Sequence, residues 1–150
     1  MSKAGDSQIV QASAVAINGR CVLIEGEPGT GKSSLALALI SRGAQLIGDD
    51  GVYLSRREAD GNACVCASPP PNIEGLIEVR GVGLMTRPLA PPTPVALVLS
   101  LAAKTERLPE SLKHRSWLGC AIPVLPFAPG SIAPAERALA ALEMHGLPLP

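Results

Sequence analysis

The stretch Gly26-Glu27-Pro28-Gly29-Thr30-Gly31-Lys32-Ser33 matches the pattern G-x-x-x-x-G-K-[ST] without a gap. A continuously apolar run, residues 21–24, leads into it, and a stretch of helix-forming residues, 33–41, leads out of it. This order of strand, glycine-rich loop and helix is that of a P-loop, whose backbone N–H groups surround phosphate oxygens at the start of a helix. The stretch therefore predicts an α/β domain that binds a nucleotide.

Each residue type in this loop has a chemical role in a phosphate site. The glycines let the backbone turn sharply and approach the phosphate oxygens. Lys32 places a positive charge beside the β- and γ-phosphates, and the Ser33 hydroxyl can be a ligand for Mg²⁺. We therefore predict that ATP and Mg²⁺ bind here. The predicted nucleotide-binding residues are Gly26, Glu27, Pro28, Gly29, Thr30, Gly31, Lys32, Ser33 and Ser34. A glycine-rich turn without a ligand is the alternative interpretation.

Turn and strand signals place this loop within one domain, residues 1–150. Asn18-Gly19 between residues 13–17 and 20–25 predicts a β-hairpin, and Gly43 is placed to end the first helix. Pro134 is placed to begin a final helix that runs to about His145. Further strands are predicted at residues 46–47, 52–55, 63–67, 76–80, 95–101 and 121–125, with 95–101 in the centre. The predicted fold class is α/β, a mixed β-sheet with flanking helices.

Composition excludes several function classes. Thirteen basic and thirteen acidic residues cancel, and only three residues are aromatic. The chain therefore has no net positive field for nucleic acid or anionic lipid, and few platforms for base stacking. Its longest clean apolar run is far shorter than the roughly 20 residues that cross a bilayer. We expect a cytoplasmic protein that binds neither nucleic acid nor a membrane.

The four cysteines, Cys21, Cys64, Cys66 and Cys120, are expected to be structural thiols. Cys64 and Cys66 are two residues apart, so on a strand they share a face. A zinc site would need a second pair of ligands, and no such pair stands elsewhere in the sequence. A metal site or a disulfide is the less favoured interpretation. The basic cluster Lys113-His114-Arg115 is interpreted as a solvated loop rather than a partner contact.

Asp49 and Asp50 follow the apolar pair Leu46-Ile47. The end of that strand should return toward the glycine-rich loop, because ligands collect at the carboxyl ends of strands in such sheets. A carboxylate there can bind Mg²⁺ or accept the proton of an attacking hydroxyl, and we assign Asp50 to the metal. A solvated turn is the alternative interpretation, because Asp-Asp-Gly is a good turn sequence.

Three stretches resemble the bacterial HPr kinase/phosphorylase family, specifically its C-terminal catalytic domain. The first is the loop and its helix, Gly26-Glu27-Pro28-Gly29-Thr30-Gly31-Lys32-Ser33-Ser34-Leu35-Ala36-Leu37. The second, Arg42-Gly43-Ala44-Gln45-Leu46-Ile47-Gly48-Asp49-Asp50, is similar to the family's run R-G-x-x-L-[IV]-A-D-D. The third, Leu76-Ile77-Glu78-Val79-Arg80-Gly81-Val82-Gly83-Leu84-Met85, is similar to L-[LI]-E-[IV]-R-G-[LV]-G, which generic P-loop proteins lack. The resemblance covers residues 9–109 and leaves 110–150 less well defined.

The resemblance implies an enzyme that phosphorylates a serine of an HPr-like phosphocarrier protein and can remove the phosphate by phosphorolysis. It implies that Lys32 holds the phosphates, that Asp49 transfers the proton and that Arg107 assists catalysis. Ser33 and Glu78 would be the magnesium ligands, although an ion pair of Glu78 with Arg80 is the alternative. The family also implies a homo-oligomer, a hexamer, that regulates a phosphotransferase system.

Two departures from the family pattern leave a second function open. Gln11 stands where the family usually has a histidine, and Ser131 lies in a segment that lacks the family's basic P-x-K-x-G-R loop. The chain is also expected to be a short form without the N-terminal domain of the longer members. A nucleotide-binding regulator with impaired catalysis is therefore the alternative. A small ATPase of the AAA kind is disfavoured by the early Asp49 and by Glu78.

Overall fold

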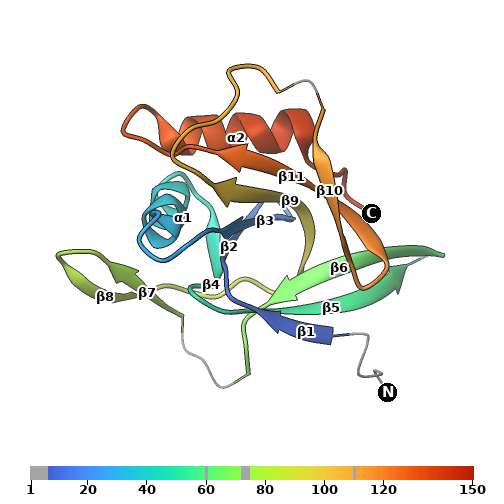
Figure 1. The fold of residues 1–150 in the computed structure, drawn as a ribbon. Coiled ribbons are helices and arrows are strands. Elements are labelled where there is room, and N and C mark those ends of the chain that lie inside the picture. The colour runs from blue at the N-terminus through green and yellow to red at the C-terminus, as the bar shows by residue number, and fades with distance from the viewer. Residues whose placement is uncertain (1–6, 60, 72–74, 110) are drawn as a thin grey trace.

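The computed structural model describes residues 7–59, 61–71, 75–109 and 111–150 (Figure 1). These residues form a mixed sheet, a separate two-stranded hairpin and two helices. The elements are β1 (Ser7–Val10), β2 (Ser13–Ile17), β3 (Arg20–Glu25), α1 (Lys32–Ile40), β4 (Gln45–Gly48), β5 (Val52–Ala59), β6 (Asn62–Ser68), β7 (Leu76–Val79), β8 (Gly83–Thr86), β9 (Thr93–Leu101), β10 (Lys113–Trp117), β11 (Cys120–Phe127) and α2 (Pro134–His145).

Strand β9 is central in the sheet, as its long apolar run predicts. It pairs with β3 in parallel on one side. On its other side its first residues pair with β6, antiparallel, and its last four pair with β11, parallel. Two branches therefore share this strand: β4-β2-β3-β9-β11-β10 and β9-β6-β5-β1. Figure 1 shows the second branch curled beneath the first.

Each face of the central strands packs against a different layer, because successive side chains of a strand point to opposite faces. Val22 and Ile24 of β3 belong to a core cluster that includes residues of α1 and α2. Cys21 and Leu23 belong to a second cluster with residues of β5 and β6. All four side chains are buried, so the continuous apolar run marks a strand covered on both faces. The helices thus lie on one face and β5, β6 and β1 on the other (Figure 1).

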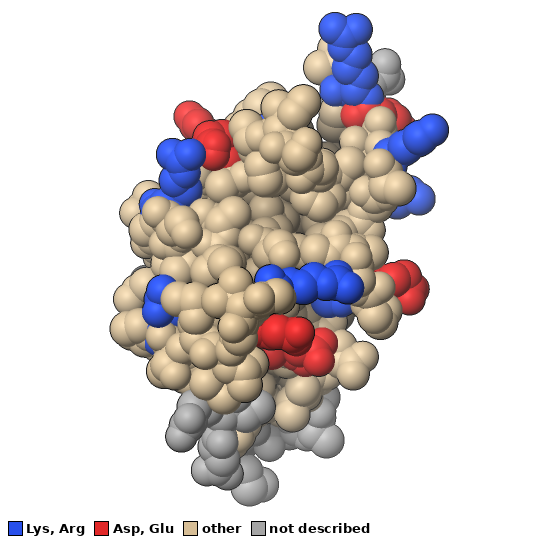
Figure 2. Space-filling model, turned by 90° about the vertical axis from the view of Figure 1, so that its left-hand side faces the viewer, with Lys and Arg blue, Asp and Glu red and all other residues tan. Residues whose placement is uncertain are grey.

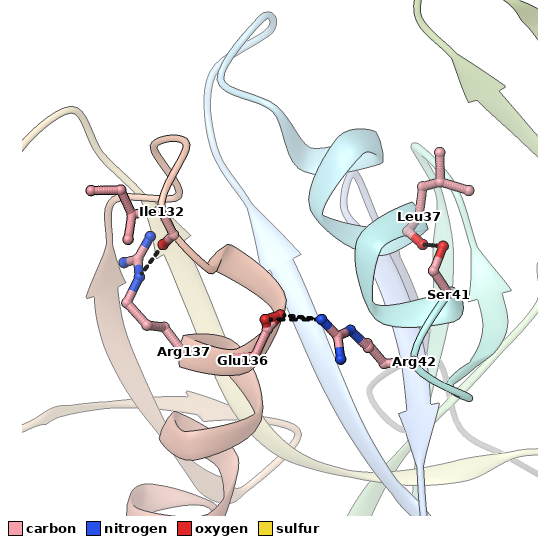
Figure 3. A network of polar contacts seen from close by, with 6 residues as sticks. All are labelled: Leu37, Ser41, Arg42, Ile132, Glu136 and Arg137. Carbon is pink, nitrogen blue, oxygen red and sulfur yellow. Dashed lines mark hydrogen bonds and ion pairs between the residues drawn. The ribbon is translucent and has the colours of Figure 1, made fainter.

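The two helices contact each other, and an ion pair joins the C-terminal end of α1 to the first turn of α2 (Figure 3). Just after α1, Arg42 Nη2 donates to both carboxylate oxygens of Glu136 on α2, at 3.0 and 3.2 Å. The Ser41 hydroxyl donates to the Leu37 carbonyl, and Arg137 donates to the Ile132 carbonyl before α2. Neither described helix has the length and apolar character needed to cross a bilayer.

Strand directions bring two loops to one edge of the sheet. β2 is antiparallel to β3 and to β4, so β3 and β4 run in the same direction. The carboxyl ends of both strands therefore meet at the same edge, with β2 between them. The glycine-rich loop follows β3 and Asp49 follows β4, which confirms that the strand before Asp49 returns toward the loop.

The predicted turns are present in the structure. Asn18 and Gly19 both have positive φ and join β2 to β3. Gly43 has φ 101° and its N–H donates to Ile40, while the N–H of Ala44 donates to Leu39. This is the bonding pattern of a Schellman ending. The final helix begins at Pro134 and ends at His145, as expected.

The interpretation of Lys113-His114-Arg115 as a solvated loop is wrong. These residues form strand β10, which pairs antiparallel with β11 at the edge of the sheet. Charged side chains suit such an edge, because they discourage pairing with other chains. The four cysteines are free thiols, and Cys64 and Cys66 share a face of β6 with their sulfur atoms 3.9 Å apart.

Candidate active site

The glycine-rich loop is folded around the ammonium group of Lys32. Nζ donates to the carbonyl oxygens of Gly26, at 2.7 Å, and Glu27, at 3.3 Å. Thr30 closes the loop, because its hydroxyl donates to the Glu27 carbonyl at 2.7 Å. Gly31 precedes the first residue of α1 with φ 99°, a conformation that glycine adopts without steric cost. The loop thus stands at a helix N-terminus with a lysine beside it, an arrangement suited to phosphate.

Gly26 has no room for a side chain. A Cβ atom there would lie 2.7 Å from the Thr30 hydroxyl oxygen and 3.1 Å from Cβ of Leu101. The backbone at the start of the loop therefore packs directly against β9. This close approach is a physical reason for glycine at the first position of the pattern.

Asp49 is the point at which three elements meet. Its Oδ1 accepts hydrogen bonds from the hydroxyls of Ser13 on β2, at 2.8 Å, and Ser33 on α1, at 2.7 Å. Its Oδ2 accepts a hydrogen bond from the backbone N–H of Glu78 on β7, at 3.1 Å. The carboxylate is half-buried, and these donors fix its position next to the glycine-rich loop.

A tight turn presents the two acids. Asp50 has φ 62°, a left-handed conformation that Asp tolerates better than most residues. A Cβ atom on Gly48 would lie 2.2 Å from the carbonyl oxygen of Gly51, so the backbone here doubles back on itself. Asp49 points inward as a result, whereas Asp50 is exposed at the rim.

An open cavity of about 530 Å³ lies between the loop, this turn and the β7–β8 hairpin. Its lining residues are Gln11, Ser13, Gly26, Pro28, Gly29, Gly31, Lys32, Ser33, Ser34, Asp49, Asp50, Glu78 and Arg80. Figure 2 views the molecule from the side of α1 and this hairpin, and basic and acidic side chains lie next to each other there. Charge on this face is therefore local and mixed, as expected for a chain whose net charge is zero.

The oxygen atoms of this cavity fit a magnesium ion that is shared with a phosphate. Mg²⁺ prefers oxygen ligands and usually keeps several waters, so one or two protein groups are enough when phosphates supply the rest. The Ser33 hydroxyl and the Asp49 carboxylate are adjacent, and Glu78 and Asp50 line the same cavity. Among the described residues no group of three His, Cys, Asp or Glu side chains forms a cage of its own.

The structure brings most of the predicted site residues together. Seven of the nine predicted nucleotide-binding residues line the cavity, and Glu27 and Thr30 are bonded within the same loop. Asp49, Asp50 and Glu78 line it too. Arg107 does not: it is an exposed residue of the segment 102–109 and is absent from the cavity lining.

Ser13 and Arg80 also line the cavity but were not assigned to the site from the sequence. Ser13 carries no motif, and only its place at the start of β2, opposite the end of β3, puts it beside Asp49. For Arg80 the sequence predicts only an ion pair with Glu78, as the alternative to metal binding by Glu78. Glu78 and Arg80 both line the cavity. The ion pairs found among the described residues do not include one between Glu78 and Arg80.

Known proteins are similar to this chain in sequence. The model of the family described as HPr Serine kinase C-terminal domain matches residues 2–89, which include the loop, Asp49 and Glu78. A protein of Clostridium botulinum (strain Eklund 17B / Type B), named HPr kinase/phosphorylase, is 46% identical over 71 residues, 47% of this chain and 22% of that protein. One of the same name from Bordetella pertussis (strain Tohama I) is 52% identical over 64 residues, 43% of this chain and 20% of that protein.

A solved structure resembles most of this chain. The structure of the Hpr(Ser) kinase/phosphatase from Coxiella burnetii matches with a TM-score of 0.74 and 27% identity. The match covers 92% of this chain and 95% of that chain. By contrast, the matched segments span only about a fifth of the length of the two curated relatives above.

Proposed function

The chain belongs to the HPr serine kinase C-terminal domain family, and we propose that it is an ATP- and Mg²⁺-dependent serine kinase that acts on an HPr-like phosphocarrier protein. One observation carries the proposal: the Asp49 carboxylate lies 2.7 Å from the Ser33 hydroxyl, beside the lysine of the phosphate loop. A carboxylate, a hydroxyl and an ammonium group thus line one cavity, and they would supply a proton acceptor, a metal ligand and a phosphate-binding cation.

The loop and Lys32 would bind the polyphosphate. Phosphoryl transfer depends mainly on positioning and on neutralising the charge of the phosphate oxygens. Lys32 Nζ donates to the loop carbonyls of Gly26 and Glu27, and its three N–H donors can turn to the phosphates. Ser33, with Glu78 and Asp50 at the rim, would hold Mg²⁺, which when bound would neutralise charge on the transferred phosphoryl group.

Asp49 would accept the proton of the substrate serine. An ionised carboxylate has about four lone-pair sites, and two on Oδ1 and one on Oδ2 are occupied by Ser13, Ser33 and the Glu78 N–H. The remaining site on Oδ2 is available to a substrate hydroxyl. In phosphorolysis an oxygen of inorganic phosphate would attack the phosphorus, the serine oxygen–phosphorus bond would break and pyrophosphate would form. Asp49 would take the proton of the attacking phosphate and pass it to the serine oxygen.

The first test is a direct assay with Mg-ATP and an HPr-like protein. We expect one phosphoserine on that protein, detected by mass spectrometry, and expect Mg²⁺ chelation to abolish it. A chain that binds Mg-ATP and yields no phosphoserine would contradict the kinase proposal. Adding inorganic phosphate to the phosphorylated product tests phosphorolysis separately.

A nucleotide-binding regulator is the second candidate, favoured by Gln11, which lines the cavity in place of the family's histidine. Gln cannot take up a proton near neutral pH. The variant Asp49→Asn separates the two candidates. The kinase proposal predicts a fall in phosphotransfer of about 10²–10⁴-fold with Mg-ATP affinity retained. If wild type and variant bind Mg-ATP equally and neither transfers phosphate, the regulator is supported instead.

The proposed kinase would work in a particular setting, as part of an assembly and with a further catalytic residue. We infer a cytoplasmic setting, where a phosphotransferase system would supply the HPr-like partner, and a homo-oligomer as in the family. Arg107 stays a predicted catalytic residue in an exposed segment. Its assignment is tested by Arg107→Ala, which should lower the rate of phosphotransfer and leave Mg-ATP affinity unchanged.

A further inference from the structure

A bidentate ion pair stands at the start of the phosphate loop. Glu25 is the last residue of β3 and directly precedes Gly26. Both guanidinium Nη atoms of Arg115, on β10, donate to its carboxylate: Nη1 to Oε1, and Nη2 to Oε2 at 2.7 Å. The two residues are 90 positions apart, so this contact ties the edge strand β10 to the loop.

Arg115 is held from a second side. Its guanidinium carbon lies 4.9 Å from the ring centroid of Trp117, two residues further along the same strand. The hydrogen bonds to Glu25 raise the pKa of Arg115. The side chains of Arg115 and Glu25 are only 35% and 22% exposed, so solvent screens this pair less than a surface pair. The Arg115 guanidinium is therefore held by both Glu25 and Trp117.

The charge of Glu25 matters for the cavity because Glu25 directly precedes Gly26, a residue of the cavity lining. An unpaired carboxylate one residue before Gly26 would repel a polyphosphate that enters the loop. Glu27 adds a second acid on the other side of Gly26, and Lys32 is engaged with the backbone carbonyls of Gly26 and Glu27. Among the described residues, the ion pair of Glu25 is made with Arg115.

We propose that Arg115 is a positioning residue for nucleotide binding, which acts by neutralising the Glu25 carboxylate at the entrance of the phosphate loop. This inference rests on the proposed function, since it needs a phosphate ligand in the cavity. It assigns a role to β10, a strand outside residues 2–89, the part matched by the family model. Arg115 and Glu25 are both outside the cavity lining, so Arg115 would act on an entering phosphate through the charge of Glu25, one residue before the lining residue Gly26.

The test is a double-mutant cycle on the affinity for Mg-ATP. We expect Arg115→Ala to raise Kd about tenfold, which corresponds to about 1.4 kcal/mol. Glu25→Gln alone should change it less than about threefold, and the double variant should return close to wild type, because the charge that Arg115 neutralises is then gone. A merely structural contact predicts the reverse, with the double variant as weak as Arg115→Ala.

Controls separate charge from folding. Arg42→Ala removes an arginine from another ion pair, with Glu136, outside the cavity, and should leave Kd unchanged. The defect of Arg115→Ala should shrink as salt rises, since salt screens the uncovered carboxylate. If Arg115→Ala does not fold, Arg115→Gln tests the same point. It keeps a hydrogen-bond donor for Glu25 but loses the charge, so it should show a similar loss of affinity.

Two results would overturn the inference. One is wild-type affinity of Arg115→Ala, or of Arg115→Gln in its place, and the other is no recovery of affinity in the double variant. A wild-type chain that fails to bind Mg-ATP at all is a different result, because it contradicts the proposed function itself. The fluorescence of Trp117 reports on the contact independently, since it is the one tryptophan of the sequence.

Discussion

Single residues fix the turn that presents Asp49. Gly48 is the sharpest case, because a Cβ atom there would lie 2.2 Å from the backbone oxygen of Gly51, closer than any real contact. The run that resembles the family has alanine in this place, so the chain departs from the family pattern here. The backbone of the turn is thus adapted to glycine, and the position of Asp49 depends on it.

We predict that Gly48→Ala lowers the free energy of unfolding by about 1–3 kcal/mol, since the added methyl forces the turn to shift. It should also reduce phosphotransfer, because Asp49 moves with the turn. Urea denaturation and the kinase assay measure the two effects. Gly51→Ala is the matched control, because its Cβ atom would meet only Pro70 Cγ at 3.7 Å, an ordinary contact. Equal stability of the two variants would contradict the prediction.

The residues of the phosphate loop were predictable because one short pattern contains them. Lys32 and Ser33 stand in a gapless motif, and the motif states their chemistry as well as their position. The place of Asp49 was harder to predict, because it depends on the direction in which the preceding strand runs in the sheet. Ser13 was not predictable, because a serine at a strand end has no distinctive signal and its partner is 36 positions away.

At the scale of elements, the β7–β8 hairpin forms one wall of the site. It is not part of the main sheet, and an isolated two-stranded hairpin is marginally stable in water. Ile77 is its one fully buried side chain among the described core residues, and the neighbouring Glu78 donates its N–H to Asp49. Ile77 is therefore the main apolar anchor of the hairpin, and partly buried Met85 of β8 packs against the same core cluster.

We predict that Ile77→Ala destabilises the chain by about 2–5 kcal/mol, the usual loss for a buried isoleucine. Phosphotransfer should fall as well, because the Glu78 N–H no longer holds Asp49 Oδ2. Leu84→Ala on the partner strand is the control, as this side chain is 70% exposed. Denaturant titration and initial rates give both quantities. An Ile77 variant with wild-type stability would show that the hairpin has another anchor.

Strand β6 carries a thiol that resists ionisation. Burial, with a smaller contribution from Cys64, raises the pKa of Cys66 to about 11. An unfolded thiol ionises near pH 8.5. The folded state therefore binds the proton more tightly than the unfolded state, and this contribution to stability is complete below about pH 8.5 and is lost as the pH rises toward 11.

We therefore predict that the free energy of unfolding falls between pH 8.5 and 10.5 and that Cys66→Ala makes the fall shallower. Denaturant titration at several pH values measures the slope. Cys21, whose pKa burial also raises, keeps part of the slope in the variant. The same slope in wild type and Cys66→Ala would contradict the assignment to Cys66.

Elements with strong apolar patterns were predicted and short polar ones were not. β3 and β9 are continuous apolar runs, and α2 has a proline at its start. β10 has the sequence Lys-His-Arg-Ser-Trp, which has no apolar alternation because it lies at the sheet edge. β1 and β8 are four residues long, too short for a pattern to stand out.

For the whole molecule, the fold class followed from local patterns, whereas the order of strands did not. β9 joins β3 in parallel although the intervening chain contains six elements, and β2 separates β3 from β4. No local signal specifies such pairings, because they are decided by which apolar faces bury one another. The contact of Arg115 with Glu25 is a product of this topology and could not be read from the sequence.

The proposed kinase activity requires that the cavity beside Lys32 binds Mg-ATP. Isothermal titration calorimetry of the wild-type chain and of Lys32→Ala tests this most directly. We predict one Mg-ATP per chain for wild type and a loss of affinity of at least about tenfold for the variant, which corresponds to about 1.4 kcal/mol or more. Absence of binding by the wild-type chain, or equal affinity of the two proteins, would contradict the proposal.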